Sequence, residues 1–316
     1  LRDPAAAREA VRGLARSGAD CVKVYRGLSP EVLAAVRSAA AAEGLPVIGH
    51  VPDAVSLEGS GISDVQHLTG VPRPPPGGYG TDRVREWVRA WGLLDETRIR
   101  AIVTASAGGG VAHTPTLVFW ERFFRLAGAE PEGGPARALP RYHRELFWDP
   151  TRPWNRTAKD EAALGDALRQ MKRVVRRLHE SGATIHAGSD ALNPFVVPGA
   201  SLHDELGHLV DSGLSTEAAW AAATRAAAES LGETGLGKIR EGAHADFLVF
   251  REDPTQTLGA LVTLEAVVSR GRLHTVEELE RELARYRRHF EDPLYTTLTG
   301  AFARLGDALG MTERRL

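Results

Sequence analysis

Residues 18–52 read GADCVKVYRGLSPEVLAAVRSAAAAEGLPVIGHVP, and in this stretch a short apolar strand, a helix and a second apolar strand follow one another. The apolar runs at 21–25 and 46–50 predict the two strands. Ser29 followed by Pro30 is typical of a helix start, because a serine side chain caps free backbone N–H groups and proline fits the first turn. Strands joined through a helix run parallel, so the stretch predicts a parallel sheet covered by helices.

The same alternation of helices and strands continues on both sides of this stretch. Further strands are predicted at 64–68, 116–120 and 183–190. Further helices are predicted at 3–18, 95–107, 160–180, 202–211 and 216–231. The prolines and glycines of 71–80 predict a loop. The aromatic, arginine-rich segment 121–157 predicts an insertion over the active face, in which Phe147, Trp148 or Trp154 shapes a substrate pocket.

The character of the sequence changes after Gly235. Two apolar runs, at 245–250 and 264–270, predict strands of a small β-domain, and the remainder from 277 onward predicts helices. We therefore divide the chain into an α/β part at 1–235, the strands of a small β-domain at 236–275 and a C-terminal helical extension at 276–316.

Composition excludes several classes of protein. Hydrophobic residues make up 43% and charged residues 25% of the 316 positions, as in ordinary globular proteins, and the formal net charge is −2. A nearly neutral chain gives no electrostatic reason to expect nucleic acid or an anionic membrane as a partner, so we expect a small-molecule substrate. Cys21 is the single cysteine, which excludes an intrachain disulfide. The compartment and the oligomeric state, a homo-oligomer included, stay open.

Four residues capable of binding metal stand where predicted strands end: Lys23, His50, His67 and Asp190. The carboxyl ends of parallel strands in an α/β barrel meet at one face, where active sites lie. Two imidazoles and a carboxylate are ligands of first-row metals. A lysine can be a metal ligand beside them if carbon dioxide carbamylates its amine, which yields a carboxylate able to bridge two metals. Strand alternation places Tyr25 on the same face as Lys23.

Several segments together resemble the amidohydrolase superfamily, in its branch of imidazolonepropionase-like and prolidase-like hydrolases. They are residues 18–52, SDVQHLTG at 63–70, GSDALNPFVVPGASLHDEL at 188–206, GLSTEAAWAAATRAAAESLG at 213–232 and GLGKIREGAHADFLVF at 235–250. The resemblance extends over about residues 1–272. It implies a TIM-like (β/α)8 barrel with a small composite β-domain, and a metal-dependent hydrolase of amide or other C–N bonds that uses two divalent cations, zinc being expected.

The resemblance also implies roles for individual residues. Lys23 matches the bridging lysine, His50 and His67 match the ligands of the fifth and sixth strands, and Asp190 matches the acid of the eighth strand. In the family this acid binds one metal and accepts a proton from the attacking water. As substrate-binding candidates we add Tyr25, from its place beside Lys23, Asn193, in the loop after Asp190, and His203, near the start of the next helix.

Three departures from the family pattern are present. The His-x-His pair of the first strand occurs nowhere in the sequence, and the chain resembles the family from about the third barrel helix, so we expect an N-terminally incomplete barrel. Val51, Pro52 and Asp53 follow His50 where dipeptidases of this branch carry a tyrosine, and the sixth strand has Gln66 where the family usually has glutamate. The scissile bond is therefore left as a cyclic amide, an N-acyl amino acid or a dipeptide-like amide.

Other interpretations stay open. The chain can be a non-catalytic or inactive barrel fragment, which the missing pair favours and the four remaining donors oppose. The same metal site can also hydrolyse lactones or phosphotriesters. A single histidine at a strand end is often structural, and we expect this of His113 and of His186, which lies deeper than Asp190 on the same strand. Lys23 can instead be a buried lysine paired with an acid.

Overall fold

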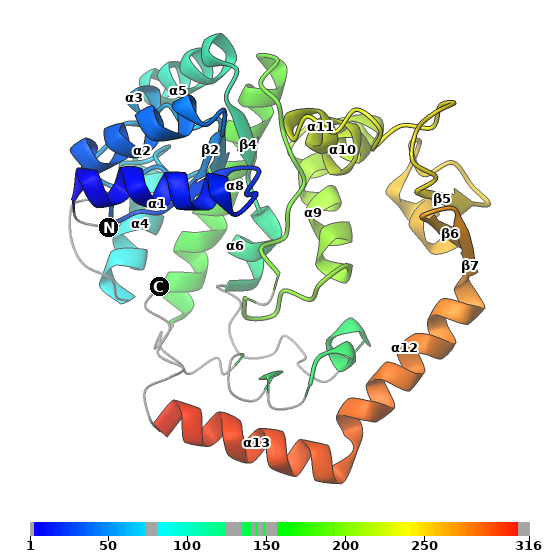
Figure 1. The fold of residues 1–316 in the computed structure, drawn as a ribbon. Coiled ribbons are helices and arrows are strands. Elements are labelled where there is room, and N and C mark those ends of the chain that lie inside the picture. The colour runs from blue at the N-terminus through cyan, green and yellow to red at the C-terminus, as the bar shows by residue number, and fades with distance from the viewer. Residues whose placement is uncertain are drawn as a thin grey trace.

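The computed structural model describes residues 3–73, 81–123, 134–140, 143, 144, 148, 157–191 and 193–308. The first part of the chain is an α/β fold in which helices pack around a parallel sheet (Figure 1). The sheet contains β1 (Val22–Val24), β2 (Val47–Gly49), β3 (Asp64–Gln66) and β4 (Ala112–Thr114), in the order β1-β2-β3-β4. All three neighbouring pairs are parallel.

The order of the strands in space follows their order in sequence. A doubly wound sheet reverses direction at a switch point, whereas a barrel adds each strand beside the previous one. An isolated parallel bridge between His113 and Ile185 places the extended segment 183–190 next to β4, on the side away from β3. The described strands therefore follow the sequential order of an α/β barrel.

The helices of this part begin where the sequence predicts in most cases. Asp3 caps α1 and Ser29 caps α2, each by accepting a backbone N–H of the first turn. The helices are α1 (Pro4–Arg16), α2 (Pro30–Ala42), α3 (Leu57–Ser60), α4 (Thr81–Gly92), α5 (Glu96–Gly109), α6 (Leu117–Phe123), α8 (Ala158–Glu180), α9 (Ala200–Asp211), α10 (Thr216–Ala223) and α11 (Arg225–Ser230), with a 3-10 turn η1 (Gly134–Ala138).

Two predicted elements are wrong, and the strand predicted at 183–190 is reduced to an isolated bridge at Ile185. The run 116–120 is not a strand, because β4 precedes it and its apolar residues lie in α6. Pro115 offers no N–H to a sheet, and Thr116 turns the chain with a φ of 51°. The helix predicted at 216–231 is interrupted at Thr224, whose φ of −132° and ψ of −93° are not helical.

The packing of β1 confirms the predicted alternation. Val22 and Val24 are buried in the main hydrophobic core, together with apolar residues of α2, α5 and α8. Lys23 and Tyr25 are exposed, and Tyr25 retains 43% of its accessible surface. One face of the strand therefore packs against the helices, and the other face carries Lys23 and Tyr25, the candidates for metal and substrate binding.

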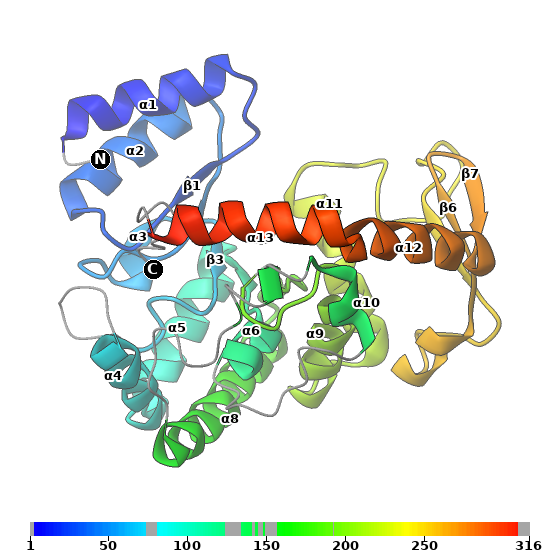
Figure 2. The same ribbon diagram turned by 90° about the horizontal axis from the view of Figure 1, so that it is seen from below.

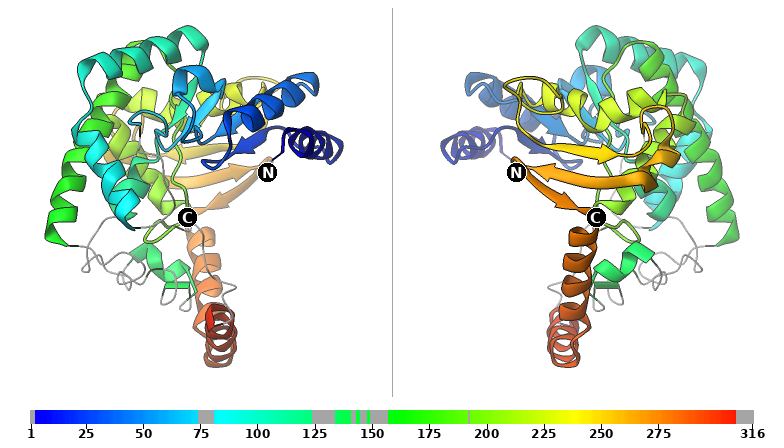
Figure 3. Two further views of the ribbon diagram at one scale, coloured as in Figure 1. Left: turned by 90° about the vertical axis from the view of Figure 1, so that its left-hand side faces the viewer. Right: turned by 90° about the vertical axis from the view of Figure 1, so that its right-hand side faces the viewer.

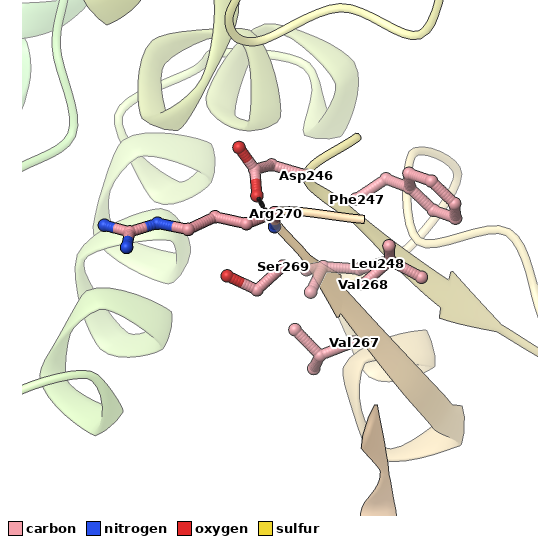
Figure 4. A pocket seen from close by; sticks show the side chains of 7 residues that line it. All are labelled: Asp246, Phe247, Leu248, Val267, Val268, Ser269 and Arg270. Atoms are coloured by element: carbon pink, nitrogen blue, oxygen red, sulfur yellow. Dashed lines mark hydrogen bonds between the residues drawn. The ribbon is translucent and has the colours of Figure 1, made fainter. Parts of the chain in front are cut away.

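The second part of the chain is a small antiparallel sheet followed by helices. The sheet has the order β5 (Phe247–Phe250), β6 (Leu264–Ser269) and β7 (Arg272–Thr275), with a 3-10 turn η2 (Leu258–Thr263) before β6. The strands β5 and β6 lie within the predicted runs, whereas β7 is an addition. Figure 4 shows a shallow hollow at one end of this sheet, where the Asp246 carboxylate accepts a hydrogen bond of 2.6 Å from the Arg270 backbone N–H.

The chain continues from this sheet into α12 (Val276–Glu291) and α13 (Pro293–Ala308). Figure 1 shows α12 leading away from the small sheet, and Figure 2 shows the two helices crossing the molecule almost as one line. In the side views of Figure 3 they project from the rest of the chain as an arm. Among the described residues, no helix combines the length and the apolar character that crossing a bilayer requires.

Candidate metal centre

The residues of the candidate site follow the carboxyl ends of neighbouring strands. His50 comes directly after β2, His67 after β3, and Asp190 after the segment that bridges to β4. His67, Thr116 and Asp190 have φ values of 57°, 51° and 54°. Such left-handed backbone is disfavoured for residues other than glycine, and it tends to persist where function requires it. Leu68, directly after His67, shares this conformation with a φ of 55°, so four such residues occur at one edge of the sheet.

His50 is buried and lies in a row of three rings. Its ring centroid is 4.0 Å from that of Tyr25 and 4.8 Å from that of His67. Burial lowers the pKa of His50, and the nearby charges of His67 and Lys23 lower it further. The ring is therefore neutral at pH 7, and its Nδ1 is buried without a hydrogen-bond partner in the described part of the chain.

Gly49 allows His50 to reach this position. A Cβ at Gly49 would lie 2.4 Å from the Val24 carbonyl oxygen and 3.2 Å from the Lys23 Cγ, and the φ of Gly49 is 118°. No other residue fits such a close approach of backbone to backbone without strain. The glycine therefore brings the end of β2 against β1, with Lys23 and His50 on adjacent strands.

His67 is held by neighbours on both sides of its ring. Nδ1 lies 2.7 Å from Thr116 Oγ1, and Nε2 lies 3.9 Å from Asp190 Oδ2. Burial lowers the pKa of His67, the negative charge of Asp190 opposes this, and the positive charge of Lys23 adds to it. We infer a neutral imidazole, which is the form that binds metal.

Lys23 and Asp190 complete the cluster on its open side. The charge of Lys23 acts on both imidazoles, so the amine lies on the same face of the sheet. Lys23 is exposed, which corrects the alternative of a buried lysine paired with an acid. The Asp190 side chain is 34% exposed and is thus accessible from solvent.

The substrate-binding candidates are placed differently. Tyr25 packs against the His50 ring, and Asn193 Nδ2 donates a hydrogen bond of 2.9 Å to the Asp190 backbone carbonyl. His203 is exposed on α9, and its role stays a prediction. In the predicted insertion, Trp148 is 2% exposed and its ring lies 5.4 Å from that of Phe195, which follows Asp190. Phe147 and Trp154 lie outside the described residues.

The chemistry of these donors suits a divalent cation. Two neutral imidazoles and an accessible carboxylate are zinc ligands, and the unpartnered His50 Nδ1 is a buried nitrogen in need of a partner. Within the described ranges, however, no three histidine, cysteine, aspartate or glutamate side chains form a ready-made ligand group. The residues fit a metal by type and proximity, and side-chain movement would have to complete the coordination.

A second group of polar residues lies just before the strand ends: Asp64 begins β3, three positions before His67, and His186 stands four positions before Asp190. His186 Nδ1 lies 3.1 Å from Asp64 Oδ2, and His186 Nε2 lies 2.8 Å from Ser230 Oγ. Thr114 Oγ1 also donates to the Asp64 carboxylate, at 3.0 Å. The order Asp–His–Ser is that of a hydrolase triad, but Ser230 ends α11, where helix carbonyls disfavour an oxyanion. We assign this group to structure.

Comparison with known proteins agrees with the geometry. The model of the Amidohydrolase family matches residues 22–274 of this chain. The chain belongs to the amidohydrolase family. No curated protein sequence matches this amidohydrolase chain.

Solved structures of similar fold are enzymes of this kind. Bottromycin amidohydrolase is similar with a TM-score of 0.73 and 25% identity, over 90% of this chain and 62% of that one. A Xaa-Pro dipeptidase with bound methionine gives 0.57 and 18% over 87% and 59%, and a putative prolidase from Bifidobacterium longum gives 0.55 and 20% over 90% and 64%. The chain thus spans about three fifths of the length of these structures.

Sequence reasoning missed Thr116, which contacts His67, because it assigned this residue to a strand. The available signal was Thr-Pro-Thr directly before an apolar run at 114–116. Proline ends a strand, and a threonine before an apolar run is typical of a helix start.

Proposed function

We propose that this amidohydrolase chain carries a metal-dependent site for hydrolysis of amide or other C–N bonds. One observation carries the proposal: His50, His67 and Asp190 lie side by side, although Asp190 is far from the two histidines in the sequence. The ring centroids of the two histidines are 4.8 Å apart, and His67 is 3.9 Å from Asp190. The sequential parallel strands support a barrel at 1–235, with a small β-domain at 236–275 and a helical extension at 276–316.

His50, His67 and Asp190 are the residues that would hold the cation, which we take to be zinc. Zinc in such a site polarises a carbonyl oxygen and lowers the pKa of water toward ~7. Lys23 would serve as a further ligand once carbamylated, since its exposed amine on the same face is accessible to carbon dioxide. The sequence has no His-x-His pair for a second cation, so we expect these donors to hold one zinc ion.

Asp190 is the proposed general base. Its carboxylate is partly exposed and lies beside the ligand His67, where it accepts the proton of the attacking water. The same carboxyl group then donates that proton to the leaving nitrogen. The Asp190 backbone is in the left-handed conformation, and Asn193 donates a hydrogen bond to the Asp190 carbonyl oxygen. These two features fix the position from which the Asp190 side chain extends.

The proposed substrates are small peptide-like amides. Similar structures include a bottromycin amidohydrolase, a Xaa-Pro dipeptidase and an ochratoxinase. The exposed ring of Tyr25 beside His50 offers a flat surface for the group next to the scissile bond. N-acyl amino acids, dipeptides and cyclic amides form the test panel, with lactones and phosphotriesters as the competing class.

The test is zinc-dependent hydrolysis by the purified chain. The chain is freed of metal, titrated with zinc, and incubated with the panel, and products are followed by mass spectrometry. We expect amide hydrolysis that rises to one equivalent of zinc and is absent in His50→Ala. Zinc binding without hydrolysis would support the interpretation as an inactive barrel, and no zinc binding would disprove the metal centre.

A further inference from the structure

Thr116 makes an unusual use of its hydroxyl group. Oγ1 donates its one hydrogen to the Pro115 carbonyl oxygen at 2.8 Å, and it lies 2.7 Å from His67 Nδ1. A hydroxyl that has already donated can only accept, so His67 Nδ1 must carry the hydrogen. The second nitrogen, Nε2, is then unprotonated, and this is the nitrogen that faces Asp190.

This arrangement leaves the start of α6 without its usual cap. A threonine before the first helical residue normally accepts a backbone N–H of the first turn with its own hydroxyl. Here the acceptor comes from another helix: Glu205 Oε2, on α9, accepts the Val118 N–H at 2.7 Å. The nearby Leu117 N–H also acts to lower the pKa of this carboxyl group. Glu205 therefore caps the start of α6, and the Thr116 hydroxyl is not needed for capping.

Capping of α6 by Glu205 instead of by Thr116 lowers the stability of the fold. Glu205 is 0% exposed, its Oε1 has no hydrogen-bond partner in the described part of the chain, and burial raises its pKa to about 7. A buried, half-satisfied carboxyl group destabilises a fold relative to a helix capped by its own threonine. Further contacts join α9 to α6, including Arg122 with Asp204 at 3.0 Å and Glu121 with His208 at 3.4 Å.

We propose that Thr116 and Glu205 are positioning residues for His67: Glu205 caps α6, which frees the Thr116 hydroxyl to fix the His67 ring with Nδ1 protonated and Nε2 available as a ligand. The proposal rests on the proposed function in its choice of His67 as a metal ligand. Neighbours that bond the second nitrogen of a ligating histidine set its tautomer and orientation, and their loss typically weakens metal affinity by ~10–100-fold.

The tautomer is tested first, in the full chain without metal. Histidines are labelled with ¹⁵N, the His67 signals are identified by their absence in His67→Gln, and long-range ¹H–¹⁵N spectra show which ring nitrogen is protonated. We expect Nδ1–H in the wild type and in Thr116→Ser, and a mixture of tautomers in Thr116→Val. Nε2–H in the wild type would mean that Thr116 donates to His67, and the proposal would be wrong.

Zinc affinity is tested second, by competition with a chromophoric chelator. Thr116→Val and Glu205→Ala should weaken zinc binding by ~10–100-fold. Thr116→Ser and Glu205→Gln should bind as the wild type does, because a hydroxyl and a carbonyl oxygen remain in place. The matched control is Thr114→Val, which removes a hydroxyl two positions earlier, at the Asp64 contact, and should change neither the tautomer nor zinc affinity.

The outcomes separate this proposal from the function on which it rests. A wild type that binds no zinc disproves the metal centre, whereas its His67 tautomer still decides whether Thr116 acts as proposed. A Thr116→Val chain that binds zinc like the wild type disproves the positioning role and leaves the metal centre intact. If Thr116→Val fails to fold by circular dichroism, the wild-type tautomer and its retention in Thr116→Ser decide the question.

Discussion

His50 and His67, which follow β2 and β3, lie ring to ring and each has a ring nitrogen without a close hydrogen-bond partner among the described residues, whereas His186, four positions before Asp190, uses both of its ring nitrogens. His50 Nδ1 is buried without a described partner, and His67 Nε2 has Asp190 only at 3.9 Å. His186 is bonded to Asp64 at 3.1 Å and to Ser230 at 2.8 Å. A histidine with both nitrogens used is structural, and one with a free buried nitrogen is available to a ligand.

The backbone also differs between the two groups of residues. His67, Thr116 and Asp190 in the candidate site have left-handed backbone, whereas Asp64 and His186 in the second group do not. Strained backbone lowers stability, so it persists where it positions a side chain for another purpose. Strain and unused hydrogen-bonding capacity together distinguish the candidate site from a buried polar cluster of similar composition.

The largest effect is expected for Asp190→Asn. The amide cannot accept the proton of water, so kcat should fall by ~10²–10⁴-fold at saturating zinc, while His50 and His67 still hold the cation. Stability should change little, because the side chain is 34% exposed. The change is measured by steady-state kinetics and metal analysis, with the exposed Asp166→Asn as control. Activity within twofold of the wild type would remove Asp190 from the mechanism.

A pair of matched substitutions addresses the comparison directly. His186→Asn should lower the free energy of unfolding by about 1–3 kcal/mol, because buried hydrogen bonds to Asp64 and Ser230 are lost, and should leave zinc affinity unchanged. His67→Asn should abolish tight zinc binding and should lower stability less than His186→Asn, because one described buried hydrogen bond is lost instead of two and asparagine tolerates the left-handed backbone. Urea denaturation and zinc titration measure both quantities. Equal effects of the two substitutions would show that the two groups of residues do not differ in role.

Gly49→Ala tests the close approach that places His50. The new Cβ would meet the Val24 carbonyl oxygen at 2.4 Å with a φ of 118°, so the strands must separate. We expect a loss of about 1–3 kcal/mol in unfolding free energy, together with weaker zinc binding. Gly165→Ala, in α8, where a Cβ would meet only the Arg169 side chain at 3.8 Å, is the control and should stabilise the chain slightly. A stable Gly49→Ala chain with normal zinc affinity would contradict the geometry.

The smallest effect concerns pH and Glu205. Burial raises its pKa from 4.5 to about 7, so the folded chain binds the proton more tightly than the unfolded chain. The corresponding stability is fully present below pH 4.5 and is lost as pH rises through about 7. In Glu205→Gln this decline should be reduced by on the order of 2 kcal/mol between pH 5 and 8. Unfolding curves across this range measure the difference, and parallel declines in both chains would refute the assignment.

The sequence predicted the donors of the candidate site well and their supports poorly. His50, His67 and Asp190 stand at the ends of predicted strands and Lys23 stands within one, and strands in an alternating pattern are visible without coordinates. The helix starts at Asp3 and Ser29 were also visible, because capping is decided within four residues. The strand at 116–120 was misplaced, because an apolar run alone does not distinguish a short strand from the first turns of a helix.

By itself the sequence determined the alternation of strands and helices, the side chains at the strand ends and the family to which the chain belongs. Only the tertiary structure decided what those side chains contact. Thr116 reaches back 49 positions to His67, Glu205 reaches 87 positions to the start of α6, and His186 reaches 122 positions to Asp64. The reason is physical: local propensity acts over a few residues, whereas a hydrogen bond requires two groups within about 3 Å, and folding alone brings residues so far apart in the chain to that distance.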